Sequence, residues 1–84
     1  MRKMPKDSRA QSDAAQKAIA IAAEHVSAGA TSGMRDSAAL RLDDARTCLG
    51  RGDYKYAVKA AKDSVDYSLG ALSAESSQIA ALLA

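Results

Sequence analysis

Side chains able to carry out acid–base or metal chemistry are sparse in this 84-residue chain, which contains one histidine and ten acidic residues. Catalysis and metal binding both need several such groups placed to act on one another. Glu24 and His25 are adjacent, so on a helix their side chains point about 100° apart and do not form a pair. The carboxylates of Asp43 and Asp44 diverge in the same way. We therefore expect solvated charges, no cofactor and no enzymatic activity.

Cys48 is the single cysteine, so it cannot form a disulfide within the chain. Its place beside Leu49, near the end of an expected helix, favours a small buried hydrophobic residue. A lone thiol is typical of a reducing compartment, which predicts the cytoplasm. The glycines Gly50 and Gly52 lack the lysine and the preceding strand of a phosphate-binding loop. No apolar run approaches a membrane span. The sequence thus indicates neither a small-molecule substrate nor a membrane partner.

Charge is nearly balanced, with a formal net charge of +2, whereas nucleic-acid-binding domains usually present a strongly basic stripe. The positive excess lies at the N-terminus. Residues 1–7 offer nothing to bury and are expected to form a flexible, solvated tail. The alternative is a basic arm that contacts phosphate groups of a nucleic acid or a lipid surface. That arm would consist of Arg2, Lys3, Lys6 and Arg9.

The elements that must position these residues are three amphipathic helices, expected at 8–28, 34–50 and 53–82, with the second starting between Met34 and Ser37. Apolar residues of the first two recur at spacings of four, three and four, which is typical of one helix face. These residues are Ala15, Ile19, Ala22 and Val26, then Ala38, Leu42, Ala45 and Leu49. Gly50 or Gly52 should end the second helix with a positive φ. Asp53 should cap the third, and its replacement by alanine should cost about 1 kcal/mol.

The third expected helix carries apolar residues at strict seven-residue intervals: Val58, Val65, Leu72 and Ile79. Such a seam is typical of helices that pair along their length. Gly70 within it indicates either a close backbone approach or a bend. The apolar end of the chain either packs on the first helix or pairs with a second copy. We predict the second arrangement, a homodimer whose interface contains Val65, Leu72, Ile79, Leu82 and Leu83.

A second contact surface is suggested by Tyr56, which should point away from the side that Tyr54 buries. It lies close in sequence to Arg51 and Lys59. Because tyrosine and arginine are enriched at binding hot spots, these three residues form a candidate surface for a protein partner. The alternative is a half-exposed tyrosine that lies over the loop.

The segment from Leu42 to Leu72 resembles two families of helical hairpins. Gly52-Asp53-Tyr54 followed by Ala57, Ala61 and Ser64 resembles the second helix of a tetratricopeptide repeat. The same segment is similar to the HEPN superfamily, whose members often dimerise and include ribonucleases. The residues that carry this resemblance are Leu42, Ala45, Leu49, Gly52, Tyr54, Ala57 and Val58, then Ala60, Ala61, Val65, Tyr67 and Leu72. The ribonuclease motif, an arginine followed closely by a histidine, is not matched by His25.

The sequence as a whole predicts an all-α three-helix bundle with a C-terminal helical hairpin, in one domain spanning 8–84. The expected function is that of a small bacterial-type adaptor or regulator that acts through protein–protein contact as a homodimer. The alternative is a HEPN-like, nucleic-acid-associated regulator or toxin–antitoxin component that uses the basic arm. Strong, salt-dependent binding to RNA or DNA would distinguish the two.

Overall fold

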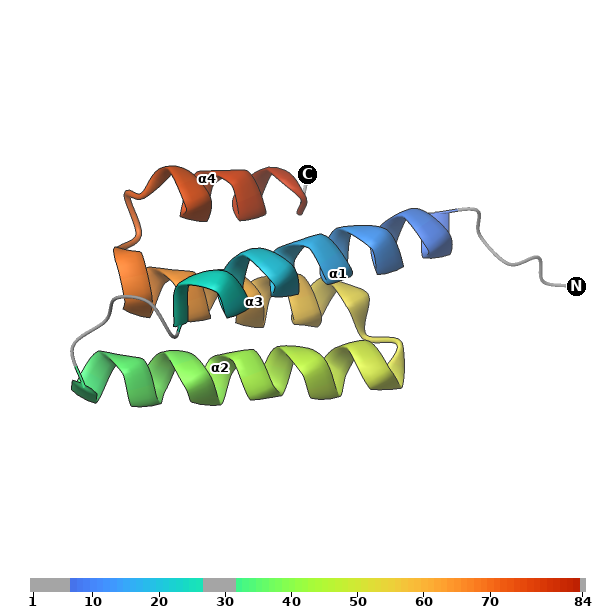
Figure 1. Cartoon of the computed structure of the whole chain (residues 1–84). Helices are drawn as coiled ribbons and strands as arrows, with labels where there is room; N and C mark the ends of the chain where they lie inside the picture. The colour runs from blue at the N-terminus through green and yellow to red at the C-terminus, as the bar shows by residue number, and fades with distance from the viewer. Residues whose placement is uncertain (1–6, 27–31, 84) are drawn as a thin grey trace, which may run out of the picture.

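The chain folds into four α-helices in the computed structural model, which describes residues 7–26 and 32–83 and the side chains of 9–26 and 34–83. The helices are α1 (Asp7–Val26), α2 (Ser32–Arg51), α3 (Tyr54–Leu69) and α4 (Ala74–Ala81). The described residues contain no strand, and the prediction of an all-α helical bundle is therefore confirmed. Successive helices reverse direction, so α1 and α3 run the same way while α2 and α4 oppose them (Figure 1).

The α2–α3 hairpin is the most extensive pairing of the bundle, and α1 packs across both of its helices. The half-length α4 turns back over α3, with its axis antiparallel to α3, and lies beside α1 (Figure 1). The fourth helix is half as long as α3, and the residues that follow it, Leu82 and Leu83, reach the first turns of α3. We refer to the surface of α1 and α3 on which α4 packs as the α1–α3 groove.

Alanine dominates the core, because seven fully buried alanines line the contacts among the first three helices: Ala15, Ala18, Ala22, Ala38, Ala45, Ala57 and Ala61. Alanine lets helices approach closely but buries little apolar area per residue. The larger core side chains are few: Ile19, Leu42, Val58, Val65 and Ile79. The predicted apolar faces of the first two helices are confirmed, with Val26 and Leu49 only partly buried at their ends.

A hydrogen bond deep in the α2–α3 contact was not foreseen. The hydroxyl Oγ of Ser64, which is fully buried, donates to the carbonyl oxygen of Ala38 at 2.8 Å. This bond satisfies a hydroxyl that would otherwise be costly to bury, and it fixes the register of α3 on α2.

The turn between α2 and α3 is a Schellman motif built around Gly52. The amide of Gly52 donates to the carbonyl of Leu49 at 3.1 Å, and that of Asp53 donates to the carbonyl of Cys48 at 2.9 Å. Gly52 has a φ of 83°, so the predicted positive φ is confirmed at this glycine. Asp53 occupies the N-cap position of α3, as expected, but its side chain makes no capping hydrogen bond. The capping role predicted for the carboxylate is therefore wrong.

The predicted continuous helix over 53–82 is also wrong, because the chain breaks at Gly70 and reverses. Gly70 has φ 101° and ψ 150°, a conformation that is open essentially only to glycine. A Cβ added there would meet nothing within 4 Å, so Gly70 marks a bend and not a close approach. Ser73 then caps α4 by accepting a hydrogen bond from the amide of Ser76 at 3.0 Å. The reversal lets Ile79 enter the chain's own core.

The helix boundaries differ from the expectation in smaller ways as well. Helix α2 begins at Ser32, before the predicted start between Met34 and Ser37, and α1 begins at Asp7, the last residue of the predicted tail. Residues 1–6 of that tail, with Arg2, Lys3 and Lys6, lie outside the described residues. The predicted end of the first helix at residue 28 also lies outside them.

Candidate functional site

A surface hollow of about 470 Å³ lies between α2 and α3, at the half of the hairpin nearer its turn. We refer to it as the α2–α3 hollow. The side chains around it are Arg41, Asp44, Thr47, Cys48, Arg51, Tyr56, Lys59, Ala60 and Asp63. The regular helices on both sides hold these residues in fixed positions, since they lie at successive turns of α2 and α3.

All three residues predicted as a partner surface line this hollow. Arg51 comes from the last turn of α2, whereas Tyr56 and Lys59 come from the first turns of α3. Tyr56 is 63% exposed, so its ring lies on the surface, more exposed than the half-exposed alternative. The ammonium Nζ of Lys59 lies 5.9 Å from the centroid of the Tyr56 ring, within the range of a cation–π contact. The structure thus brings the predicted surface together in one place.

The charges around the α2–α3 hollow are mixed. Arg41 Nη1 donates to Asp44 Oδ2 at 3.0 Å within one turn of α2, and this pair is nearly half exposed. Arg51 and Lys59 add two cations, and Asp63 adds one carboxylate. Cys48 lines the same hollow and packs against the core, but it is only half-buried and so is less buried than predicted. Aromatic, cationic and acidic groups therefore lie side by side around the hollow.

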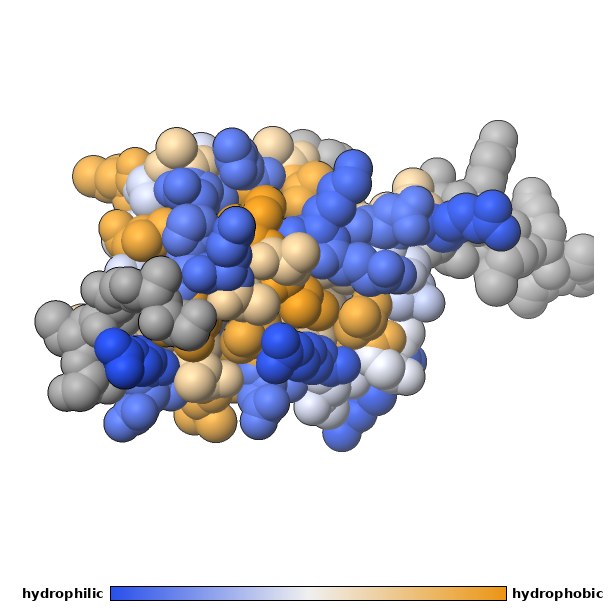
Figure 2. Space-filling view, viewed as in Figure 1, coloured by the Kyte–Doolittle hydropathy of each residue, from blue (hydrophilic) through white to orange (hydrophobic). Residues whose placement is uncertain are grey.

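The predicted homodimer interface is only partly available in this fold. Val65 and Ile79 are both 0% exposed within a single chain, so a second copy cannot reach them while α4 is docked. Leu82 and Leu83 are half-buried around a cavity of about 70 Å³, against Gln11 and Ala14 of α1 and Tyr54 and Val58 of α3. Leu72 is different, because it is 99% exposed in the connection between α3 and α4. Figure 2 shows hydrophobic residues projecting at this end of the molecule.

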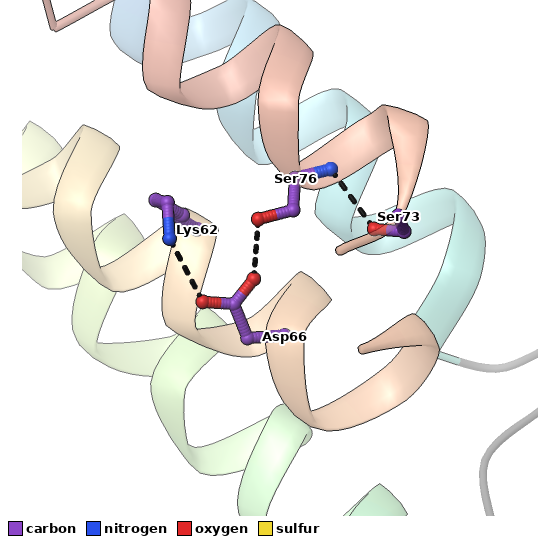
Figure 3. Close-up of polar contacts among 4 residues, drawn as sticks. All are labelled: Lys62, Asp66, Ser73 and Ser76. Carbon is purple, nitrogen blue, oxygen red and sulfur yellow. Dashed lines mark hydrogen bonds and ion pairs between the residues drawn. The ribbon is translucent and has the colours of Figure 1, made fainter. Parts of the chain in front are cut away.

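Polar contacts fasten α4 to the rest of the bundle. Ser76 Oγ donates to Asp66 Oδ1 at 2.5 Å, and Lys62 Nζ donates to Asp66 Oδ2 at 3.0 Å (Figure 3). Near the same end of α4, Nε2 of His25 lies 3.9 Å from Oε2 of Glu75, an ion pair when the histidine is protonated. Sequence reasoning missed both links across to α4. They join residues that come together only because the chain reverses at Gly70, and the serine cap at Ser73 was the signal that could have revealed them.

The structure also bears on the predicted basic arm, on metal binding and on membrane spanning. Arg9 is exposed on the first turns of α1, whereas the other residues of the predicted basic arm are not described. Among the described residues, no group of three or more His, Cys, Asp and Glu side chains could hold a metal ion. None of the described helices is both long and apolar enough to cross a membrane.

Comparison with known proteins adds no relative. No family model matches the chain. Neither a curated protein nor a solved structure matches it. The resemblances to tetratricopeptide-repeat and HEPN hairpins therefore stay predictions.

Proposed function

We propose that this chain is a small, non-enzymatic helical interaction module that acts as a homodimer and binds a protein partner at the α2–α3 hollow. One observation carries the proposal: Arg51, Tyr56 and Lys59 converge on a single hollow formed by two rigid helices. The lone thiol Cys48 further supports a reducing compartment, and we propose the cytoplasm as the site of action.

The exposed aromatic and charged side chains around the hollow are of the kinds that bind protein partners. Tyrosine and arginine are enriched among hot-spot residues. A tyrosine ring supplies a large amphipathic surface at modest entropic cost, because its side chain has only two rotatable bonds. Tyr56 is exposed although it is among the few aromatic side chains of the protein, so its ring is available for contact. The hollow receives a protruding side chain of a partner, and the paired and unpaired charges at its rim provide specificity for that partner.

A site-specific photo-crosslinker tests this surface in the source cells. Placed at Tyr56, it is expected to yield a discrete crosslinked protein, and Arg51→Ala should reduce the yield at least several-fold. The matched control carries the crosslinker at Gln16, an exposed residue of α1 outside the hollow. Equal crosslinking at the two positions, or none at Tyr56, would contradict the proposed partner surface.

A further inference from the structure

Leu72 is the only leucine among the four apolar residues that recur at seven-residue intervals, and it occupies an unusual position. The other three members, Val58, Val65 and Ile79, are buried, whereas Leu72 is 99% exposed. The exposure arises only because the chain reverses between Gly70 and Ser73. A fully exposed leucine in a periodic seam indicates a second arrangement in which the seam is continuous.

That arrangement requires the connection between α3 and α4 to become helical. Gly70 has φ 101° and ψ 150°, and Ser73 has φ −69° and ψ 157°. When both residues take right-handed helical dihedrals, α3 and α4 merge into one helix from Tyr54 to Ala81, about 42 Å long. The seam then runs unbroken along one face. However, α4 then leaves its place against α1 and α3, so Ile79, which is fully buried in the observed fold, becomes exposed. A single chain cannot sustain this loss of apolar burial, so the groove needs another occupant.

We propose that the occupant is α4 of a second copy, so that the protein forms a domain-swapped homodimer through a continuous α3–α4 helix. This inference rests on the homodimer in the proposed function and specifies how that homodimer forms. Each α4 restores in the partner's groove the contacts that it makes within one chain, which makes exchange of an identical element a low-cost route to a dimer.

We call the observed fold, in which α4 packs on its own chain, the closed form. The pairing of α3 and α4 in the closed form indicates the symmetry of this dimer. In the closed chain α4 runs antiparallel to α3, with Ser76 opposite Asp66. Two long helices that keep this pairing between copies lie antiparallel about a two-fold axis, and the axis passes close to residues 71 and 72. Leu72 of one copy therefore meets Leu72 of the other across the axis. The dimer buries the one seam residue that the closed chain leaves in water.

The balance between the two forms is set by features of the hinge and of α4. Opening relieves the glycine-only conformation of Gly70 and extends the helical hydrogen bonding through residues 70–73. It also buries Leu72. Against these gains stands the entropy of association. The capping hydrogen bond from the Ser76 amide to Ser73 is lost when the helix is continuous, whereas the contacts of α4 with α1 and α3 are the same in both forms. Because the open form is a dimer, the equilibrium depends on protein concentration.

The decisive variant is Leu72→Asp, measured by size-exclusion chromatography with light scattering. The wild-type chain is expected to dimerise at high micromolar concentration. Leu72→Asp should stay monomeric, because two carboxylates would meet at the axis, and should melt like wild type at low concentration. Leu40→Asp is the matched control, because Leu40 is a 61% exposed leucine of α2 away from the hinge, and it should dimerise as wild type does. Dimerisation of Leu72→Asp at wild-type strength overturns the proposal.

Gly70→Ala should shift the equilibrium toward the dimer. Alanine is strained at this φ and favours a helix, and each dimer contains two hinges, so the association constant should rise by about 100-fold or more. Gly50→Ala, a substitution at an exposed helical glycine, should leave association unchanged. An unchanged association constant in Gly70→Ala overturns the proposal.

A disulfide identifies which chain provides α4. In a Cys48→Ser background, Asp66→Cys with Ser76→Cys should link two chains in the dimer fraction and close within one chain in the monomer fraction. A dimer with only intrachain disulfides overturns the swap but leaves the homodimer standing. A wild-type chain that remains monomeric overturns both, whereas the partner surface at the α2–α3 hollow is judged separately by the crosslinking at Tyr56.

Discussion

The carboxylate of Asp66 is expected to be the main polar contribution to the docking of α4. It accepts from the buried Ser76 hydroxyl at 2.5 Å and from Lys62 at 3.0 Å, and its side chain is only 23% exposed. A hydrogen bond to a charged group contributes about 1.5–3 kcal/mol, whereas a helical ion pair of the Lys62 type contributes about 0.3–0.5 kcal/mol. Asp66→Ala should therefore lower the free energy of unfolding by about 2–3 kcal/mol, chiefly by leaving the Ser76 hydroxyl buried without an acceptor.

Urea denaturation followed by far-UV circular dichroism, at a protein concentration low enough to keep the chain monomeric, measures this effect. A loss of that size corresponds to a melting temperature lower by about 10–20 °C in a domain of this length. Asp43→Ala, at an exposed aspartate of α2, is the matched control and should change stability by less than about 0.5 kcal/mol.

A double-mutant cycle apportions the loss between the two partners of Asp66. The coupling energy of Asp66→Ala with Ser76→Ala should exceed about 1 kcal/mol, while that with Lys62→Ala should stay below about 0.5 kcal/mol. Additivity holds within about 0.3–0.5 kcal/mol for independent sites. A coupling of Asp66 with Ser76 inside that range would refute the reasoning that this hydrogen bond fastens α4.

Four further substitutions test the fold by the same denaturation assay. Ile79→Ala should destabilise the chain by about 2–5 kcal/mol, because the isoleucine is fully buried in an alanine-rich core and its removal leaves a cavity; a loss below that range would show that α4 is not docked. Gly52→Ala should cost about 1–2 kcal/mol because its φ is 83°, whereas Gly50→Ala in the exposed last turn of α2 should be neutral or stabilising; equal effects would argue against the Schellman turn. Asp53→Ala should cost less than about 0.5 kcal/mol, because the side chain makes no capping hydrogen bond; the sequence alone predicted about 1 kcal/mol, and that larger loss would restore the cap.

Local patterns were sufficient to predict the first two helices and the turn that follows them. The spacing of Ala38, Leu42 and Ala45 defines one helix face without reference to the rest of the chain, and all three are buried. The positive φ of Gly52 likewise follows from local chemistry, because a helix that ends in glycine favours the left-handed conformation. The proximity of Arg51, Tyr56 and Lys59 was also predicted, because they flank the same turn of the hairpin. Their role as a partner surface stays a prediction.

The break at Gly70 could not be predicted from the seam alone, because two signals in the same segment conflict. Val58, Val65, Leu72 and Ile79 favour a continuous helix, whereas Gly70 and, three residues later, Ser73 have the residue types of a helix stop and an N-cap. The outcome depends on whether burial of Ile79 in the core of its own chain stabilises the fold more than a continuous helix does. That difference comes from packing between distant parts of the chain, which no local pattern contains. The contact between Asp66 and Ser76 depends on that reversal, so it was hidden for the same reason.

Sedimentation equilibrium of the unmodified chain, from low to high micromolar concentration, tests the central claim of self-association most directly. The account predicts an average mass that rises from the 8.7 kDa of one chain toward that of two chains as concentration increases. A mass that stays at 8.7 kDa across the whole range would contradict the homodimer. The exposure of Leu72 would then have no explanation in this fold.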